Sequence, residues 1–150
     1  MERTISIATS GITLAILFLL STVPSMEAQD HQCSNATLDG SFGFAGTGTI
    51  FNPSASLFAQ VGRQTFDGNG NTDASATTSI NGASFPATMK GTYAVNRDCT
   101  GSLTLHVSPV DITVHADFVI ASDGAEFQAI VTDAGSVVTY VAKKQFHHEE

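Results

Sequence analysis

From Cys33 onward the chain alternates between short segments rich in Val, Ile, Thr and Phe and clusters of Gly, Asn, Asp and Pro. Such segments favour strands, and the clusters favour turns. The pattern predicts eight strands, at residues 38–51, 57–66, 72–80, 85–95, 101–107, 110–121, 126–132 and 137–146. The short connections predict antiparallel neighbours. An all-β, up-and-down barrel of about eight strands is therefore expected, with a sandwich as the alternative.

The side chains within these segments alternate between an apolar and a polar face. In residues 110–121, the apolar face carries Val110, Ile112, Val114, Ala116, Phe118 and Ile120. A tight turn at Ser108-Pro109 would place Leu105 opposite Ile112 and His106 opposite Asp111. In the first segment, the face to be buried carries Leu38, Gly40, Phe42, Phe44, Gly46, Gly48 and Ile50.

The stretch "TFDGNGNTDAS" places an oxygen-bearing side chain at every second position from Asp67 to Asp73. An EF-hand loop beginning at Asp67 would need Gly at its sixth position and Glu at its twelfth, where Thr72 and Thr78 stand. Asn-Gly is instead a strong hairpin signal. The sequence therefore predicts a turn at Asn69-Gly70 and no metal site.

The turn at Asn69-Gly70 sets a register that directs Arg63 into the barrel and Gln60 and Gln64 outward. A buried guanidinium needs a counter-charge, and a ligand carboxylate would supply one. The alternatives are an Arg63 at the barrel mouth, reaching water, or a bulge that exposes it. The predicted ligand-binding residues are Arg63, Tyr93, Tyr140, Met89 and Thr78.

Residues 1–28 have the pattern of a secretory signal peptide, with an apolar run at 12–23 and small residues at Ser25 and Ala28. An uncleaved anchor is the alternative. Cleavage would leave one barrel domain at residues 29–150, in a secreted or periplasmic location and with no membrane insertion. Without Glu2, Arg3 and Glu27 the chain keeps 5 basic and 12 acidic residues, a net charge of −7. This acidic balance argues against nucleic-acid binding.

Two cysteines, Cys33 and Cys99, lie in the exported part. An even number in an oxidising compartment favours a disulfide over a reactive or metal-binding pair, for which no Cys-x-x-Cys spacing exists. Closing a loop of this length would stabilise the fold by about 4 kcal/mol through loop-closure entropy.

Three stretches carry a resemblance to a known family: "CSNATLDGSFGF", "FAQVGRQTFDGNGN" and "GTYAVNRDCTGSL". They resemble the motifs of uncharacterised small secreted bacterial proteins, and the match spans most of the exported chain. The resemblance implies a disulfide-linked barrel similar to lipocalins or to the allene oxide cyclase barrel. The lipocalin Gly-x-Trp motif is absent, since the chain has no Trp.

The expected function is binding of a small apolar or amphipathic ligand, including one that bears a carboxylate, in the barrel lumen. The alternatives are a cyclase or isomerase that uses the same lumen, and a cell-envelope protein whose exterior contacts a partner. No nucleophile elbow, P-loop, HExxH or GxGxxG motif indicates catalytic residues or a cofactor. His106 and Asp111 are expected to form a solvated pair on the outer face.

Overall fold

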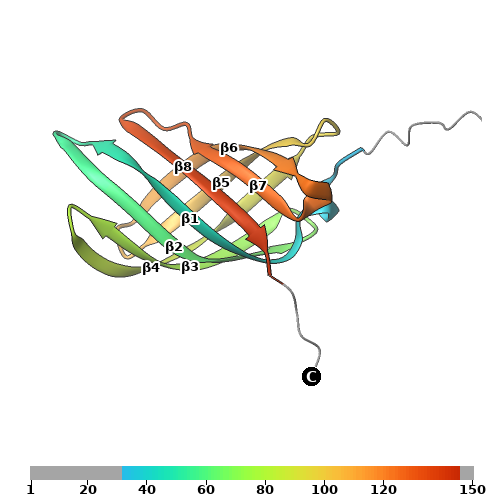
Figure 1. The fold of residues 1–150 in the computed structure, drawn as a ribbon, viewed down its shortest axis with the longest axis horizontal. Helices are drawn as coiled ribbons and strands as arrows, with labels where there is room; N and C mark the ends of the chain where they lie inside the picture. The colour runs from blue at the N-terminus through green and yellow to red at the C-terminus, as the bar shows by residue number, and fades with distance from the viewer. Residues whose placement is uncertain (1–31, 146–150) are drawn as a thin grey trace, which may run out of the picture. The chain divides into compact units, whose positions relative to one another are not determined.

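The computed structural model describes residues 32–145, so the predicted signal peptide lies outside the described residues. Eight antiparallel strands form a closed barrel in sequence order, β8 pairing with β1 (Figure 1). The predicted barrel is thereby confirmed and the sandwich excluded. The strands are β1 Asp39–Phe51, β2 Ala55–Asp67, β3 Asn71–Ile80, β4 Ala83–Val95, β5 Thr100–Ser108, β6 Ile112–Ala121, β7 Glu126–Val131 and β8 Ser136–Lys144. Two short 3-10 helices are η1, Asn35–Leu38, and η2, Ser122–Gly124.

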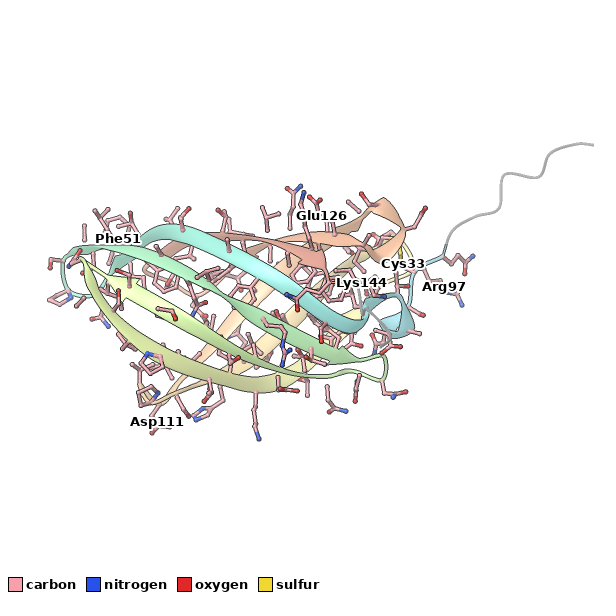
Figure 2. All side chains as sticks on the ribbon, turned by 60° about the horizontal axis from the view of Figure 1, so that its bottom comes forward. Cys33, Phe51, Arg97, Asp111, Glu126 and Lys144 are labelled. Atoms are coloured by element: carbon pink, nitrogen blue, oxygen red, sulfur yellow. A yellow bond between two sulfur atoms is a disulfide. The ribbon has the colours of Figure 1, made fainter. Side chains whose placement is uncertain are left out.

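The two ends of the barrel are built differently. One end, here called the open end, carries the connections at residues 52–54, 81–82, 109–111 and 132–135. The other, here called the closed end, carries the connections at 68–70 and 96–99 together with η1 and η2. Figure 2 shows Phe51 and Asp111 near the open end and Cys33 and Arg97 at the closed end.

Aromatic side chains fill the barrel near the closed end. Phe66 packs edge-on against Tyr93, Phe42 and Phe127, with ring centroids 4.9, 5.4 and 5.6 Å away. Phe42 is fully buried and Phe66 nearly so. Burial of each such side chain contributes about 1.5–3 kcal/mol, so this cluster is a main source of stability and a solid floor for the lumen.

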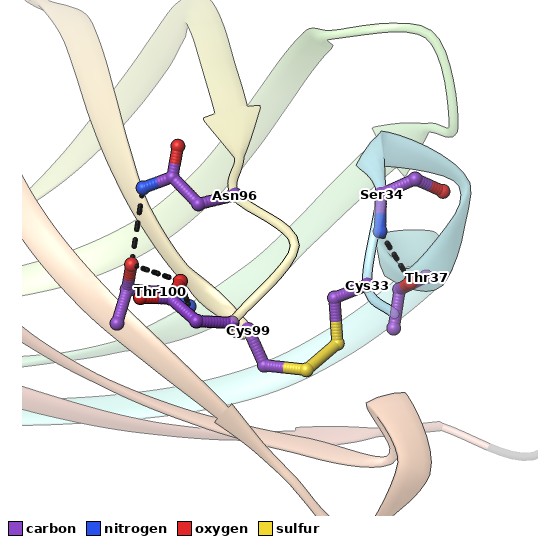
Figure 3. The surroundings of a disulfide bond; sticks show 7 residues. Cys33, Ser34, Thr37, Asn96, Cys99 and Thr100 are labelled. Carbon is purple, nitrogen blue, oxygen red and sulfur yellow. Dashed lines mark hydrogen bonds between the residues drawn. A yellow bond between two sulfur atoms is a disulfide. The ribbon is translucent and has the colours of Figure 1, made fainter. Parts of the chain in front are cut away.

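The N-terminal segment covers this floor from below. The Tyr93 hydroxyl donates to the carbonyl oxygens of Asn35, at 3.0 Å, and Leu38, at 3.2 Å. The Val95 amide donates to the Asn35 side-chain oxygen at 2.8 Å. A disulfide between Cys33 and Cys99, as predicted, ties the start of this segment to the β4–β5 connection (Figure 3).

The β2–β3 connection is a turn, as predicted, but it holds three residues, Gly68 to Gly70, rather than two. Both glycines have positive φ, 73° and 110°, which a side chain would disfavour. The Asp67 carboxylate closes the turn by accepting from the Asn69 and Asn71 amides, at 2.8 and 2.9 Å, and from the Asn71 side chain, at 2.7 Å. Thr65 consequently lies opposite Asp73 and not Ala74.

This change of one residue reverses the two faces of β2. Arg63 lies on the exposed outer face, whereas Gln60 and Gln64 are buried, with 8% and 5% of their surfaces exposed. The predicted inward orientation of Arg63 and the outward orientation of the two glutamines are therefore wrong. The faces of β3 and β4 agree with the prediction, as the burial of Ala74, Thr78, Ala87, Met89 and Tyr93 shows.

The β5–β6 connection also differs from the predicted tight turn. Leu105 pairs with Val114 and His106 with Thr113, two residues beyond the predicted partners. Because side chains alternate with a period of two, this shift leaves the faces unchanged. Ala116, Phe118 and Ile120 are buried on the predicted face.

Candidate functional site: a cavity in the barrel lumen

A cavity of about 590 Å³ occupies the lumen above the aromatic floor. It extends from the open-end connections down to Gln64, Met89 and Phe127. Its volume falls in the range of roughly 300–1,000 Å³ that small-molecule sites occupy. Small and branched apolar side chains of β5, β6 and β7 form one wall: Leu103, Leu105, Val114, Ala116, Ala129 and Val131.

Neutral polar side chains lie on the opposite wall. The Gln60 amide nitrogen donates to the Thr78 hydroxyl at 2.7 Å, and both residues line the cavity. Deeper in the barrel, the Gln64 amide nitrogen donates to the Thr72 hydroxyl at 3.1 Å, which in turn donates to the Thr65 carbonyl at 2.8 Å. These bonds use one polar atom of each glutamine side chain and leave the amide oxygens for another partner.

Tyr140, on β8, also lines the cavity. Its ring packs edge-on against Phe44 and Phe58, with centroids 5.9 and 6.4 Å away. Its hydroxyl makes no hydrogen bond within residues 32–145. In the same residues, every fully buried side-chain nitrogen or oxygen atom has a hydrogen-bond partner. The hydroxyl therefore borders the cavity. Burial raises the pKa of Tyr140 far above its usual value of 10.0, so this hydroxyl stays protonated at neutral pH.

The rim of the cavity holds one carboxylate, that of Asp133, which is hydrogen-bonded to His115. The Asp133 carboxylate accepts from the His115 backbone amide at 2.7 Å and shares a 2.8 Å hydrogen bond with the His115 ring. The hydrogen bond from the backbone amide lowers the pKa of Asp133 most, and the bond with the ring lowers it further, so this pKa lies below its usual value. Asp133 is thus an anion at the rim over the whole neutral range.

Three of the five predicted ligand-binding residues, Met89, Thr78 and Tyr140, line the cavity. The other two do not. Arg63 lies outside because the three-residue turn reverses the faces of β2, and Tyr93 is part of the aromatic floor, with its hydroxyl bonded to η1. Burial raises the pKa of Tyr93 as well.

Gln60 and Gln64 are polar cavity residues that the predicted register wrongly turned outward. The positions of the aromatic residues of β2 could have indicated the correct orientation. Phe58 and Phe66 lie on the same face of this strand as Gln60 and Gln64. Rings of this size need the interior more than Leu57 or Val61 do, and the latter two are 72% and 60% exposed.

His106 and Asp111 form the expected solvated pair, with 3.3 Å between His106 Nε2 and Asp111 Oδ1 and both side chains largely exposed. His115 lies opposite Thr104. Within residues 32–145 no three His, Cys, Asp or Glu side chains gather as metal ligands would. The same residues contain no helix of the length and apolarity needed to cross a membrane.

The fold and site define a closed eight-stranded antiparallel barrel with a lumen cavity and one disulfide. No protein-family model, curated protein or solved structure matches the chain. Functional assignment consequently rests on the chemistry of the cavity.

Proposed function

We propose that the protein binds a small apolar or amphipathic molecule in the barrel lumen. The observation that supports this most directly is the cavity of about 590 Å³, bounded by apolar side chains on one wall and by the aromatic floor below. An internal space of this size loses packing contacts when it is empty, so it is retained at a cost in stability. A ligand that fills it would recover those contacts.

The proposal places this binding outside the cytoplasm, in a secreted or periplasmic protein. The disulfide supports this location, since such bonds persist in oxidising compartments. The signal-peptide pattern of residues 1–28 and the motif resemblance to small secreted bacterial proteins point the same way. In this proposal the protein is a lipocalin-like carrier in architecture and use.

The proposal is tested by titrating the purified protein with N-phenylnaphthylamine, an uncharged dye whose fluorescence rises in apolar surroundings. Saturable binding is expected. Ala129→Phe, which puts a ring into the cavity, should weaken binding by at least about tenfold, because the dye and the ring compete for one space. Ala94→Phe is the matched control, since Ala94 is exposed on β4.

Two results would contradict the proposal. One is a protein that leaves the dye fluorescence unchanged. The other is equal binding by both phenylalanine variants after thermal unfolding has shown that both are folded. Native mass spectrometry of protein purified from its own host provides a second measurement, since a resident small molecule would appear as an added mass.

A further inference from the structure

Three of the polar groups of the cavity stand in one row across the barrel. Gly46 on β1 pairs with Tyr140 on one side and with Gln60 on the other. Gln60 pairs in turn with Thr78 on β3. All four positions face the lumen, so the three polar side chains lie on one wall of the barrel, which is formed by the adjoining strands β8, β1, β2 and β3.

Gly46 allows Tyr140 to reach toward the other two. A Cβ atom at position 46 would lie 2.2 Å from Cδ1 of the Tyr140 ring, so the ring occupies the space that a side chain would take. The ring thereby crosses β1 and contacts Phe58 on β2. This places its unpaired hydroxyl on the same wall as Gln60 and Thr78.

The row offers both donors and acceptors to a ligand. The Tyr140 hydroxyl is unbonded within residues 32–145, and the Thr78 hydroxyl accepts from Gln60 but has its own proton free to donate. The Gln60 amide oxygen has no donor in the same part of the chain. A single hydroxyl or carbonyl group could satisfy two of these three side chains at once.

No positive charge accompanies these groups. Among the described residues, the cavity lining contains no Lys or Arg, and its one ionised side chain is Asp133 at the rim. Arg63 lies on the outer face of β2. The chain as a whole carries a net charge of −8. A ligand carboxylate would therefore lose its water without gaining a counter-charge, which is unfavourable inside a protein.

We infer that the lumen selects an uncharged ligand with an apolar body and one alcohol or carbonyl oxygen. This oxygen is held by hydrogen bonds with Tyr140, Gln60 and Thr78. The apolar body packs against the β5–β7 wall. This inference rests on the proposed lumen-binding function and specifies its ligand class. It replaces the carboxylate-bearing ligand that an inward Arg63 would have suited.

The test compares two ligands of equal length, decanol and decanoate, as competitors of N-phenylnaphthylamine at neutral pH. Decanol should displace the dye at least about tenfold more effectively than decanoate, because only decanoate carries a charge to be buried. Lowering the pH below the carboxyl pKa should narrow this difference, since the protonated acid is uncharged.

Two variants locate the oxygen-binding row. Tyr140→Phe removes one hydroxyl without changing the volume and should weaken decanol binding about three- to tenfold. Thr78→Val should do the same by removing the second hydroxyl. Tyr93→Phe is the matched control, because the Tyr93 hydroxyl bonds to η1 below the floor and should leave decanol binding unchanged.

The outcomes separate the two proposals. Dye binding with decanoate as the equal or better competitor would overturn this inference and leave lumen binding intact. Unchanged decanol binding in both Tyr140→Phe and Thr78→Val would overturn the assignment of the row. A failure of the dye itself to bind would instead contradict the proposed function.

Discussion

The two tyrosines of the chain show how one residue type serves two purposes in one barrel. Both rings are directed inward, and burial raises the pKa values of both hydroxyls above the usual 10.0. The Tyr93 hydroxyl donates to two carbonyl oxygens of the N-terminal segment. Tyr140 keeps its hydroxyl at the cavity surface. The first is a structural group, and the second is available to a ligand.

This difference predicts that the same substitution destabilises the protein much more at one site than at the other. Tyr93→Phe should lower the free energy of unfolding by about 1–2 kcal/mol, because the Asn35 and Leu38 carbonyls lose their donor. Tyr140→Phe should lower it by much less, since no hydrogen bond is lost. Urea denaturation of both variants measures the difference, and an equal loss in the two would contradict this account.

At the scale of the element, β2 shows what the sequence could and could not predict. Its existence and approximate bounds follow from its composition, as do those of the other seven strands. Its orientation depends on whether the connection to β3 has two residues or three, and the two glycines of the stretch "DGNGN" suit either turn. Three-residue and two-residue turns differ little in local free energy. The burial of Phe58 and Phe66 therefore determines which turn forms. Arg63 was therefore misplaced, while Thr78, Met89 and Tyr140 were not.

The Asp67 carboxylate is the group that fixes this turn. Asp67→Ala should lower the urea midpoint at neutral pH, because three hydrogen bonds close the turn through this side chain. Asp73→Ala, a nearby exposed substitution on β3, should change the midpoint much less.

The effect of Asp67 should also depend on pH. Its hydrogen bonds with Asn71, and then with Asn69, hold the pKa of Asp67 below its usual value of 3.8. Stabilisation from a lowered carboxyl pKa is present above pH 3.8 and is lost as the pH falls through the pKa of the folded state. The difference between the parent protein and Asp67→Ala should shrink accordingly in acid. A constant difference would show that the charge is not responsible.

At the scale of the whole barrel, the two ends have separate tasks. The closed end carries the aromatic cluster, η1 and the disulfide, and the open end carries the cavity rim. The disulfide followed from the even number of cysteines, their place in the part of the chain expected to be exported, and the absence of Cys-x-x-Cys spacing. The cavity did not, because whether a lumen is filled depends on how some twenty inward side chains pack together, and no local pattern records that sum.

Loss of the disulfide should weaken the closed end and the fold together. Replacing both Cys33 and Cys99 by Ser should lower the free energy of unfolding by about 4 kcal/mol, since the bridge closes a loop with a sequence separation of 66. Denaturant unfolding with and without a reductant measures this. The parent protein should lose stability on reduction, whereas the double variant should not respond to the reductant.

If the lumen binds a ligand as proposed, the aromatic floor also determines how one ligand molecule can replace another. Among residues 32–145, Phe42, Phe66 and Phe127 pack across the lumen with η1 beneath them, so the cavity is closed below and opens toward the connections of the open end. A competing ligand cannot enter through the closed end and displace the bound molecule. The bound ligand must then dissociate before another can bind. The rate of exchange is therefore set by the dissociation rate of the bound ligand and not by the concentration of its competitors. Under the proposed lumen-binding function, the retention time of the ligand would therefore be a property of the barrel itself and would stay the same however many competing molecules surround it.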